Sequence, residues 1–167
     1  MVAISERAGV AAGTLYRHFP SKAELFVEVF HLVCGHEERT MRAAAESMPA
    51  DALAVERIEV VLGTFAERAL QNPRLAWALI AEPVDSLVDA ERLAYRARYA
   101  EMIAEMLGAG IAAGELPEQD VRFTAAALVG GCGEALVGPL SPLAERPASE
   151  TIVAALRTFV RRAVGAG

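Results

Sequence analysis

Residues 8–26, AGVAAGTLYRHFPSKAELF, decide the fold of this chain. Gly9 predicts a tight turn after a short first helix, because glycine adopts a left-handed backbone without steric cost. A second short helix is expected from about residue 11 to His18, since Pro20 disfavours helical backbone at the residue before it. Two short helices joined by a glycine turn form a helix-turn-helix, whose second helix enters the major groove of DNA.

The same stretch also predicts the start of a long third helix. Ser21 and Glu24 have the S-x-x-E spacing of a capping box, in which each side chain accepts a hydrogen bond from the other residue's backbone N–H. Apolar residues then follow at the i, i+3, i+4 spacing of an amphipathic helix, which we expect to end near Glu46, before Pro49. This helix would join the first two helices to the remainder of the chain.

The stretch resembles the DNA-reading segment of the TetR family of bacterial regulators (tetracycline-repressor, or TetR/AcrR, family). The resemblance is carried by GVAAGTLYRHF from Gly9, PSK from Pro20 and ELF from Glu24, and it is close over about the first 30 residues. The rest is similar in length, helical content and layout. The resemblance implies an all-α protein with a helix-turn-helix DNA-binding head, residues 1–26, and a helical effector-binding and dimerisation domain, residues 27–167.

The resemblance also implies a DNA-binding surface on the second helix and at the start of the third. The expected contact residues are Gly13, Thr14, Tyr16, Arg17, His18 and Lys22. By residue type, Arg17 could read guanine and the Thr14 methyl group could touch thymine, while the others serve backbone and phosphate contacts. Ala11 and Ala12 replace the polar or basic pair common in the family, which leaves the preferred operator sequence open.

Family members have a further helix before the helix-turn-helix pair, whereas Met1 falls at the start of the pair in this sequence. The apolar side chains of Ile4, Leu15 and Phe19 would then lack a cover. We therefore expect about one helix of sequence to be missing before Met1. The alternative is a natural short form with a weakened head.

Composition and charge agree with a protein that touches DNA with one end only. Of the 167 residues 54% are apolar, the mean hydropathy is +0.31 and the net charge is −6. Residues 1–26 hold a charge of +1 and the remainder holds −7. The N-terminus does not read as a signal peptide, no apolar run reaches the ~18 residues of a membrane span, and two cysteines make no disulfide framework. We expect a cytoplasmic protein that engages no membrane.

Helical patterns and caps predict about five more helices after the third. The expected starts are Asp51, Pro73, Ser86, Pro117 and Ser149, and the expected ends are near Leu70, Ala81, Ala113, Leu136 and the C-terminus. Residues 138–147, which hold three prolines, are expected to form a loop. The helix that starts at Pro117 is apolar nearly all round, so it is expected to be buried on all sides.

Large apolar or amphipathic side chains on three successive helices suggest a ligand pocket. They are Phe65, Trp77, Tyr95, Tyr99, Met102 and Met106. Methionine and aromatic residues suit a pocket that adapts to varied apolar ligands, although the same residues could simply fill a core. Arg92, Arg96 and Glu82 could supply polar specificity or lie on the surface. The resemblance implies a small apolar effector bound between these helices.

The last two helices are the expected subunit interface. Gly130, Gly131 and Gly133 each weaken an isolated helix by about 1 kcal/mol relative to alanine, and close approach of helices across a dimer is one reason to keep them. A kinked interior helix is the alternative. The resemblance implies a homodimer through these helices, which would present two heads to a palindromic operator in double-stranded DNA.

The sequence thus suggests a DNA-binding transcriptional regulator, as a repressor, that a small effector releases from its operator. The alternative is a helical ligand-binding or dimerisation protein without DNA-binding activity. An enzyme is not expected, because no nucleophile, base or paired-carboxylate pattern is recognisable. No cofactor is expected. His31, Cys34 and Glu38 share a helix face but lack the ligand spacing of a metal site, so none is expected.

Overall fold

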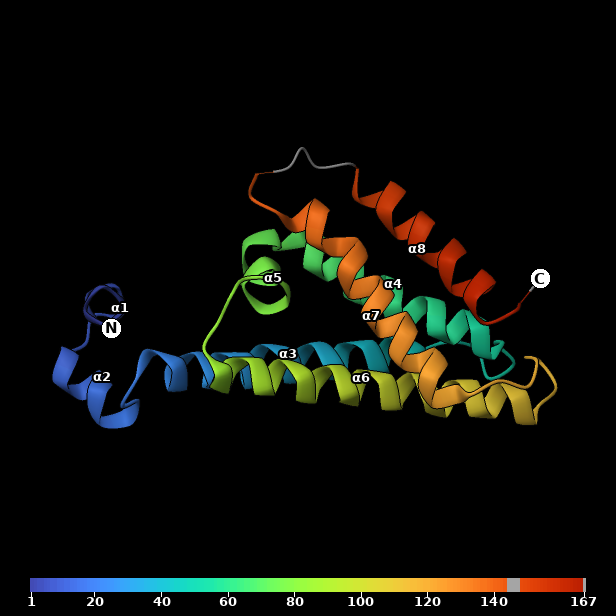
Figure 1. Cartoon of the computed structure of the whole chain (residues 1–167), viewed down its shortest axis with the longest axis horizontal. Helices are drawn as coiled ribbons and strands as arrows, with labels where there is room; N and C mark the ends of the chain where they lie inside the picture. Colours follow the sequence, from blue (N-terminus) through green and yellow to red (C-terminus); the bar gives the residue numbers. More distant parts are fainter. Residues whose placement is uncertain (144–147, 167) are drawn as a thin grey trace.

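The computed structural model describes residues 1–143 and 148–166, and these are all-helical. Its helices are α1 (Val2–Ala8), α2 (Ala12–His18), α3 (Lys22–Glu46), α4 (Ala54–Gln71), α5 (Pro73–Ile80), α6 (Ser86–Ala112), α7 (Val121–Leu140) and α8 (Ser149–Ala163). Figure 1 shows α1 and α2 as a small head beyond one end of an elongated body. The prediction of an all-α helix-turn-helix head joined to a helical bundle is confirmed in this architecture.

The helices of the head and the start of α3 form where the sequence predicts, but the predicted capping box is only half formed. Gly9 has φ of 68°, in the left-handed region, and its N–H donates to the carbonyl of Glu6 at the end of α1. Ser21 Oγ accepts a hydrogen bond of 3.0 Å from the Glu24 N–H, which caps α3. Of the two bonds of the box only this one is formed, while Glu24 Oε1 lies 3.4 Å from the Ser21 hydroxyl. A single helix of 25 residues therefore leaves the head and runs along the body.

The body is a bundle around a core shared by α3, α4, α6, α7 and α8. Ile58 of α4, Leu107 of α6 and Leu136 of α7 are fully buried in it. Figure 1 shows α3 and α6 running side by side along one edge, with α4, α5, α7 and α8 on one side of them. A smaller apolar cluster around Phe30 and Tyr95 lies where α3, α5 and α6 meet.

The predicted N-terminal cap of α4, Asp51, is wrong by two residues, because the cap is Leu53. Asp51 lies in a turn, and α4 begins at Ala54. Glu115, 61 residues away in sequence, accepts a 2.7 Å hydrogen bond from the Ala54 N–H, while Glu56 accepts one from the Leu53 N–H. A cap supplied by a distant carboxylate leaves no local sequence pattern, so Asp51 looked like the better candidate.

The predicted bounds of α7 are also wrong. Asp120 accepts hydrogen bonds from the N–H groups of Arg122 and Phe123, so the helix starts at Val121 and not at Pro117. It continues through Pro139 to Leu140, because a proline in the last turn removes only one hydrogen bond. Of the predicted loop, residues 138–140 are therefore helical, and residues 144–147 lie outside the described residues.

The prediction that α7 is buried on all sides is wrong as well. Leu128, Cys132 and Leu136 face the core, but the Phe123 side chain is 74% exposed, and Ala126, Ala127 and Gly130 are exposed too. Among the described helices α7 alone is long and apolar enough to cross a membrane by length and composition. It packs against α6, α4 and α5 on one side and leaves an apolar strip open on the other.

Candidate effector cavity and DNA-binding head

A cavity of about 500 Å³ lies inside the body, between α3, α4, α5, α6 and α7. Its walls are mainly apolar and include Phe30, Leu62, Phe65, Leu79 and Ile103. This volume falls in the range of ~300–1,000 Å³ that is typical of small-molecule sites in proteins. The body can therefore enclose an apolar molecule between the helices that the sequence analysis considered.

Three of the six predicted pocket residues line the cavity, namely Phe65, Tyr95 and Tyr99. The other three lie elsewhere. Met102 is fully buried in the main core, and Trp77 and Met106 pack against that core, but none of the three lines the cavity. On α6, Tyr95, Tyr99 and Ile103 line the cavity at successive turns, whereas Met102, next to Ile103, and Met106 do not, and Trp77 lies on α5.

Aromatic rings form a continuous row on the α3–α6 side of the cavity. Ring centroids are separated by 5.8 Å for Phe30 and Tyr95, 6.1 Å for Tyr95 and Tyr99, and 6.0 Å for Tyr99 and Phe65, all tilted. The Tyr99 hydroxyl donates to the Cys34 carbonyl at 3.2 Å, and the Tyr95 hydroxyl donates to the His31 carbonyl at 3.3 Å. These bonds tie α6 to α3, and burial raises the pKa of Tyr99 above its ordinary value.

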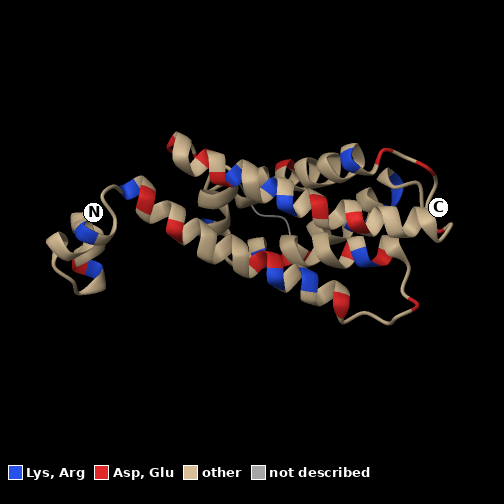
Figure 2. Cartoon of the chain, turned by 90° about the horizontal axis from the view of Figure 1, so that it is seen from below, with Lys and Arg blue, Asp and Glu red and all other residues tan. Residues whose placement is uncertain are grey.

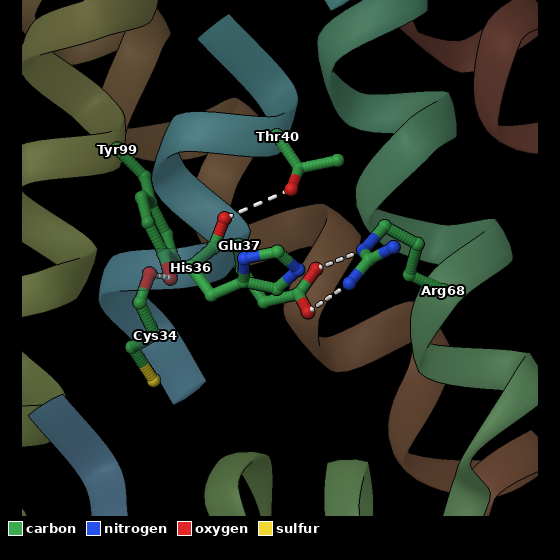
Figure 3. Close-up of polar contacts among 6 residues, drawn as sticks. All are labelled: Cys34, His36, Glu37, Thr40, Arg68 and Tyr99. Atoms are coloured by element: carbon green, nitrogen blue, oxygen red, sulfur yellow. Dashed lines mark hydrogen bonds and ion pairs between the residues drawn. The ribbon is translucent and has the colours of Figure 1, made fainter. Parts of the chain in front are cut away.

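A charged pair crosses one wall of the cavity. Figure 3 shows Glu37 of α3 and Arg68 of α4 in a two-pronged contact, with Nε 2.5 Å from Oε2 and Nη2 2.8 Å from Oε1. The Glu37 side chain is 18% exposed and that of Arg68 is 32% exposed. The hydrogen bonds to Glu37 raise the pKa of Arg68, so the guanidinium stays charged. No local spacing in the sequence indicates this pair, because its partners are 31 residues apart.

Arg92 has a structural role that the sequence analysis did not foresee. Its Nε donates to the Leu79 carbonyl at 2.8 Å, and its Nη2 donates to the Glu82 carbonyl at 2.9 Å. These carbonyls lie at and just beyond the C-terminal end of α5, where helical carbonyls lack intrahelical donors. Arg92 thus closes the end of α5 at the cavity wall, while Glu82 is exposed and contributes its backbone only.

Both cysteines line the cavity as free thiols. Burial raises the pKa of the Cys34 thiol from its ordinary value of 9.0 to about 12, and burial does the same for Cys132. No group of three or more His, Cys, Asp or Glu within the described ranges could hold a metal. His31 Nε2 instead lies 2.7 Å from a carboxylate oxygen of Glu91.

These thiols are expected to react with a disulfide reagent more than about a hundredfold more slowly in the native protein than in urea at pH 8, because burial removes most of the reactive thiolate. Their raised pKa also stabilises the fold only at lower pH. The unfolded chain loses its thiol protons near pH 9 and the native chain near pH 12, so this contribution declines as pH rises through that window. Urea unfolding at pH 8 and pH 10 should show a smaller loss of stability for C34A/C132A than for the parent chain.

The head exposes most of the residues predicted to contact DNA. Gly13, Tyr16, Arg17, His18 and Lys22 are exposed, and Thr14 is half-buried. Around Gly13 nothing lies within 4 Å of the place a Cβ would take, so the backbone is open to a close approach at this point. Figure 2 shows charges of both signs in the head.

Apolar side chains are also open on the head. Within the described residues Val2 is 58% exposed, Ile4 37% and Val10 43%. Ser5 is buried between α1 and the following turn, where its hydroxyl donates to the Val2 carbonyl at 2.8 Å. The two short helices therefore bury only part of their apolar surface against each other.

A glycine-turn helix pair with an exposed second helix, carried on a helical body, defines a helix-turn-helix protein. Residues 1–29 match the family model described as bacterial regulatory proteins, tetR family. The transcriptional repressor KstR of Mycobacterium tuberculosis is 32% identical over 121 residues, which is 72% of this chain and 52% of that protein. KstR of Mycolicibacterium smegmatis is 36% identical over 80 residues, which is 47% of this chain and 37% of that protein. The chain thus spans about half the length, or less, of these curated relatives.

Solved structures share the fold over nearly the whole chain. The fatty acid degradation regulator FadR from Bacillus halodurans superimposes with a TM-score of 0.81 at 18% identity, covering 94% of this chain and 81% of that one. FadR from Bacillus subtilis, solved in complex with stearoyl-CoA, gives 0.78 at 20% identity, covering 98% and 86%. The head of the chain thus matches the TetR family, and its body has the fold of these two regulators.

Proposed function

We propose that the protein is a dimeric transcriptional repressor that binds a palindromic operator and leaves it when a small apolar effector enters the cavity. One observation carries the proposal: the helix that begins in the head also forms a wall of the cavity. Lys22 is the first residue of α3, and Phe30, Cys34 and Glu37 of the same helix line the cavity. A ligand that moves α3 therefore moves the head.

The relatives support both halves of this proposal. KstR, which shares a third of its residues with this chain over the matched segment, is named a transcriptional repressor. FadR from Bacillus subtilis, which shares the fold, holds stearoyl-CoA. A body of this fold can thus bind a molecule with a long apolar chain, and the cavity here has mainly apolar walls. We assign residues 1–26 to the DNA-binding head and residues 27–167 to the effector-binding and dimerisation domain.

In this proposal the protein exchanges between a DNA-binding state and an effector-bound state, and effector binding releases the DNA by shifting the equilibrium between them. Without effector, the two heads match successive major-groove half-sites, about 34–36 Å apart. With effector, α3 takes a position in which the heads no longer fit that spacing. An effector can shift this equilibrium only by as much as its affinities for the two states differ. The row of aromatic rings and the Glu37–Arg68 pair are the contacts of α3 that an incoming ligand would rearrange.

The open strip of α7 and α8 supports the proposed homodimer. Phe123 of α7 and Phe159 of α8 are 74% and 43% exposed, with exposed alanines and glycine around them. The Phe159 ring lies 3.2 Å from the place a Cβ of Gly131 would take, so a small residue there lets α8 close onto α7. Apolar strips of this kind mark protein contacts, and a two-fold axis at this strip would pair the two heads. We propose a cytoplasmic location, because a regulator with this function must reach the DNA.

Binding to DNA from the upstream region of the protein's own gene, followed by fluorescence anisotropy, tests the proposal. For this experiment the protein is produced with any in-frame residues that the gene encodes upstream of Met1. We expect salt-dependent, saturable binding, with Arg17→Ala weaker by about 1–3 kcal/mol. Arg74→Ala, an exposed position on α5 outside the head, the cavity lining and the proposed dimer helices, is the matched control and should bind like the parent. Absence of sequence-specific binding would favour a helical ligand-binding protein without DNA-binding activity.

A further inference from the structure

The cavity has a charge opposite to that of the protein. Its walls carry one carboxylate, Glu37, and four guanidinium groups, which belong to Arg39, Arg68, Arg92 and Arg96. The chain as a whole has a net charge of −6. The arginines are thus concentrated around the cavity although the protein as a whole is acidic. Their charges make the electrostatic potential at the cavity more positive, which favours a negatively charged ligand.

Two of the four arginines are fully engaged by the protein. Arg68 is held by Glu37, and Arg92 donates to the carbonyls of Leu79 and Glu82. Their charges and donors hold α4 to α3 and close the end of α5. They would have to break these bonds in order to hold a ligand, so they are poor candidates for its first contact.

The other two arginines are free to hold a ligand. Arg39 of α3 and Arg96 of α6 are exposed, and neither has an ion-pair or hydrogen-bond partner in the part of the chain that the structure describes. Arg39 Nη1 lies 3.5 Å from the place a Gly35 Cβ would take, and so does the Tyr95 hydroxyl. Arg39 and Tyr95 thus both approach Gly35, and Arg39 and Arg96 both belong to the lining of the cavity.

We propose that the effector is an apolar molecule with a carboxylate head group, held by Arg39 and Arg96 at the rim of the cavity. Its apolar part lies against Phe30, Phe65 and Ile103. The identity of the head group deepens the proposed function, since it concerns the same cavity. A guanidinium donates two parallel N–H groups to the two oxygens of a carboxylate. A lysine in place of the arginine, or an alcohol in place of the carboxylate, cannot form this paired contact.

The proposal predicts discrimination by charge at constant chain length. A neutral alcohol of the same chain would bury the same apolar area but form no charge-assisted hydrogen bonds with the two guanidinium groups. Solvent and salt screen the attraction between a partly exposed arginine and a carboxylate. Each arginine is therefore expected to increase the affinity for the acid by about three- to tenfold. The two together set the preference for the acid.

Isothermal titration of the full chain with decanoate and with decan-1-ol tests the inference. We expect the parent to bind decanoate at least about tenfold more tightly than decan-1-ol, and Arg39→Gln/Arg96→Gln to bind the two alike, with its affinity for the alcohol unchanged. Arg42→Gln is the matched control, because Arg42 pairs with Glu105 across the same two helices, α3 and α6, and does not line the cavity. Circular dichroism establishes that each variant is folded.

Three results would overturn the proposal: equal binding of acid and alcohol by the parent, no binding of decanoate, or a preference for the acid that survives in the double variant. Decanoyl-CoA is a further arm. If it binds more tightly than decanoate and depends on Arg39 and Arg96, the two arginines serve the phosphates of CoA and the assignment of a carboxylate is wrong. Charge-selective binding without release of DNA would contradict the repressor mechanism and leave the head-group assignment in place.

Discussion

Adding one methyl group at Gly110 is expected to lower the free energy of unfolding by about 1–3 kcal/mol, as overpacking of a dense core does. A Cβ at this position would lie 2.5 Å from the Ala54 Cβ and 2.9 Å from Leu116 Cδ1. The Ala54 Cβ cannot rotate away, because it is fixed to the first residue of α4. The backbone of α4 or α6 must therefore shift, and the Glu115 cap on the Ala54 N–H shifts with it.

Gly108→Ala is the matched control for this substitution. Gly108 lies two residues earlier on α6, and nothing is within 4 Å of the place its Cβ would take. Alanine there should raise the free energy of unfolding by up to about 1 kcal/mol through helix propensity alone. Urea unfolding followed by circular dichroism, at equal protein concentration, measures both variants. If Gly110→Ala were as stable as Gly108→Ala, close packing of α6 against α4 would not explain this glycine.

Removing the positive partner of Glu37 is the second large expected effect. Arg68→Met leaves a largely buried carboxylate without its two hydrogen bonds. Loss of one partner from a fully buried pair lowers stability by ~3–5 kcal/mol, and the partial exposure of this pair reduces the expected loss to about 2 kcal/mol. The free energy of unfolding in urea measures it.

Arg42→Met is the control for Arg68→Met. Arg42 of α3 pairs with Glu105 of α6 at 3.5 Å, whereas Glu37 of α3 pairs with Arg68 of α4, and both side chains of the Arg42 pair are exposed, at 43% and 60%. Its loss should lower stability by less than about 1 kcal/mol. The double variant Glu37→Gln/Arg68→Met should recover part of the loss, since no charge is left unpaired. Equal effects at Arg42 and Arg68 would mean that solvent screens both pairs alike.

The sequence predicted those parts of the fold whose signals are local. The glycine turn at Gly9 and the capping box at Ser21 each depend on residues within a few positions, and the helices around them begin and end where expected. The same holds for Pro73, which starts α5. Local backbone preference and local hydrogen bonds decide these features, and a sequence displays both.

Features that depend on distant partners escaped prediction. At the start of α4 the Ala54 N–H is capped by Glu115, which lies three residues beyond the end of α6, in addition to the local cap by Glu56. The exposure of α7 escaped because its composition is apolar all round, and only packing shows which side is covered. Asp120 is a local cap for α7, but Pro117 competed with it as a start signal and was chosen wrongly.

In the candidate site, too, local features were predicted and contacts between distant residues were not. Tyr95 and Tyr99 were predicted at the cavity by helical spacing, which is a local property. The same spacing selected Met102, which is buried in the core, and did not select the adjacent Ile103, which lines the cavity. The Glu37–Arg68 pair and the closure of α5 by Arg92 join separate helices, so no spacing in the sequence indicates them. The assignments of the DNA contacts and of the effector contacts stay predictions until the experiments above are done.

The length and continuity of α3 make it a lever. With 25 residues and about 1.5 Å per residue, it is roughly 37 Å long. A tilt of about 5° at Glu37 would displace Lys22, about 22 Å away along the axis, by about 2 Å. The gain requires a stiff arm, and the one glycine of α3, Gly35, lies two residues from Glu37, so the helix from Lys22 to Cys34 contains no glycine. A molecule that shifts the wall by a fraction of an ångström can thus move the head by several times that distance.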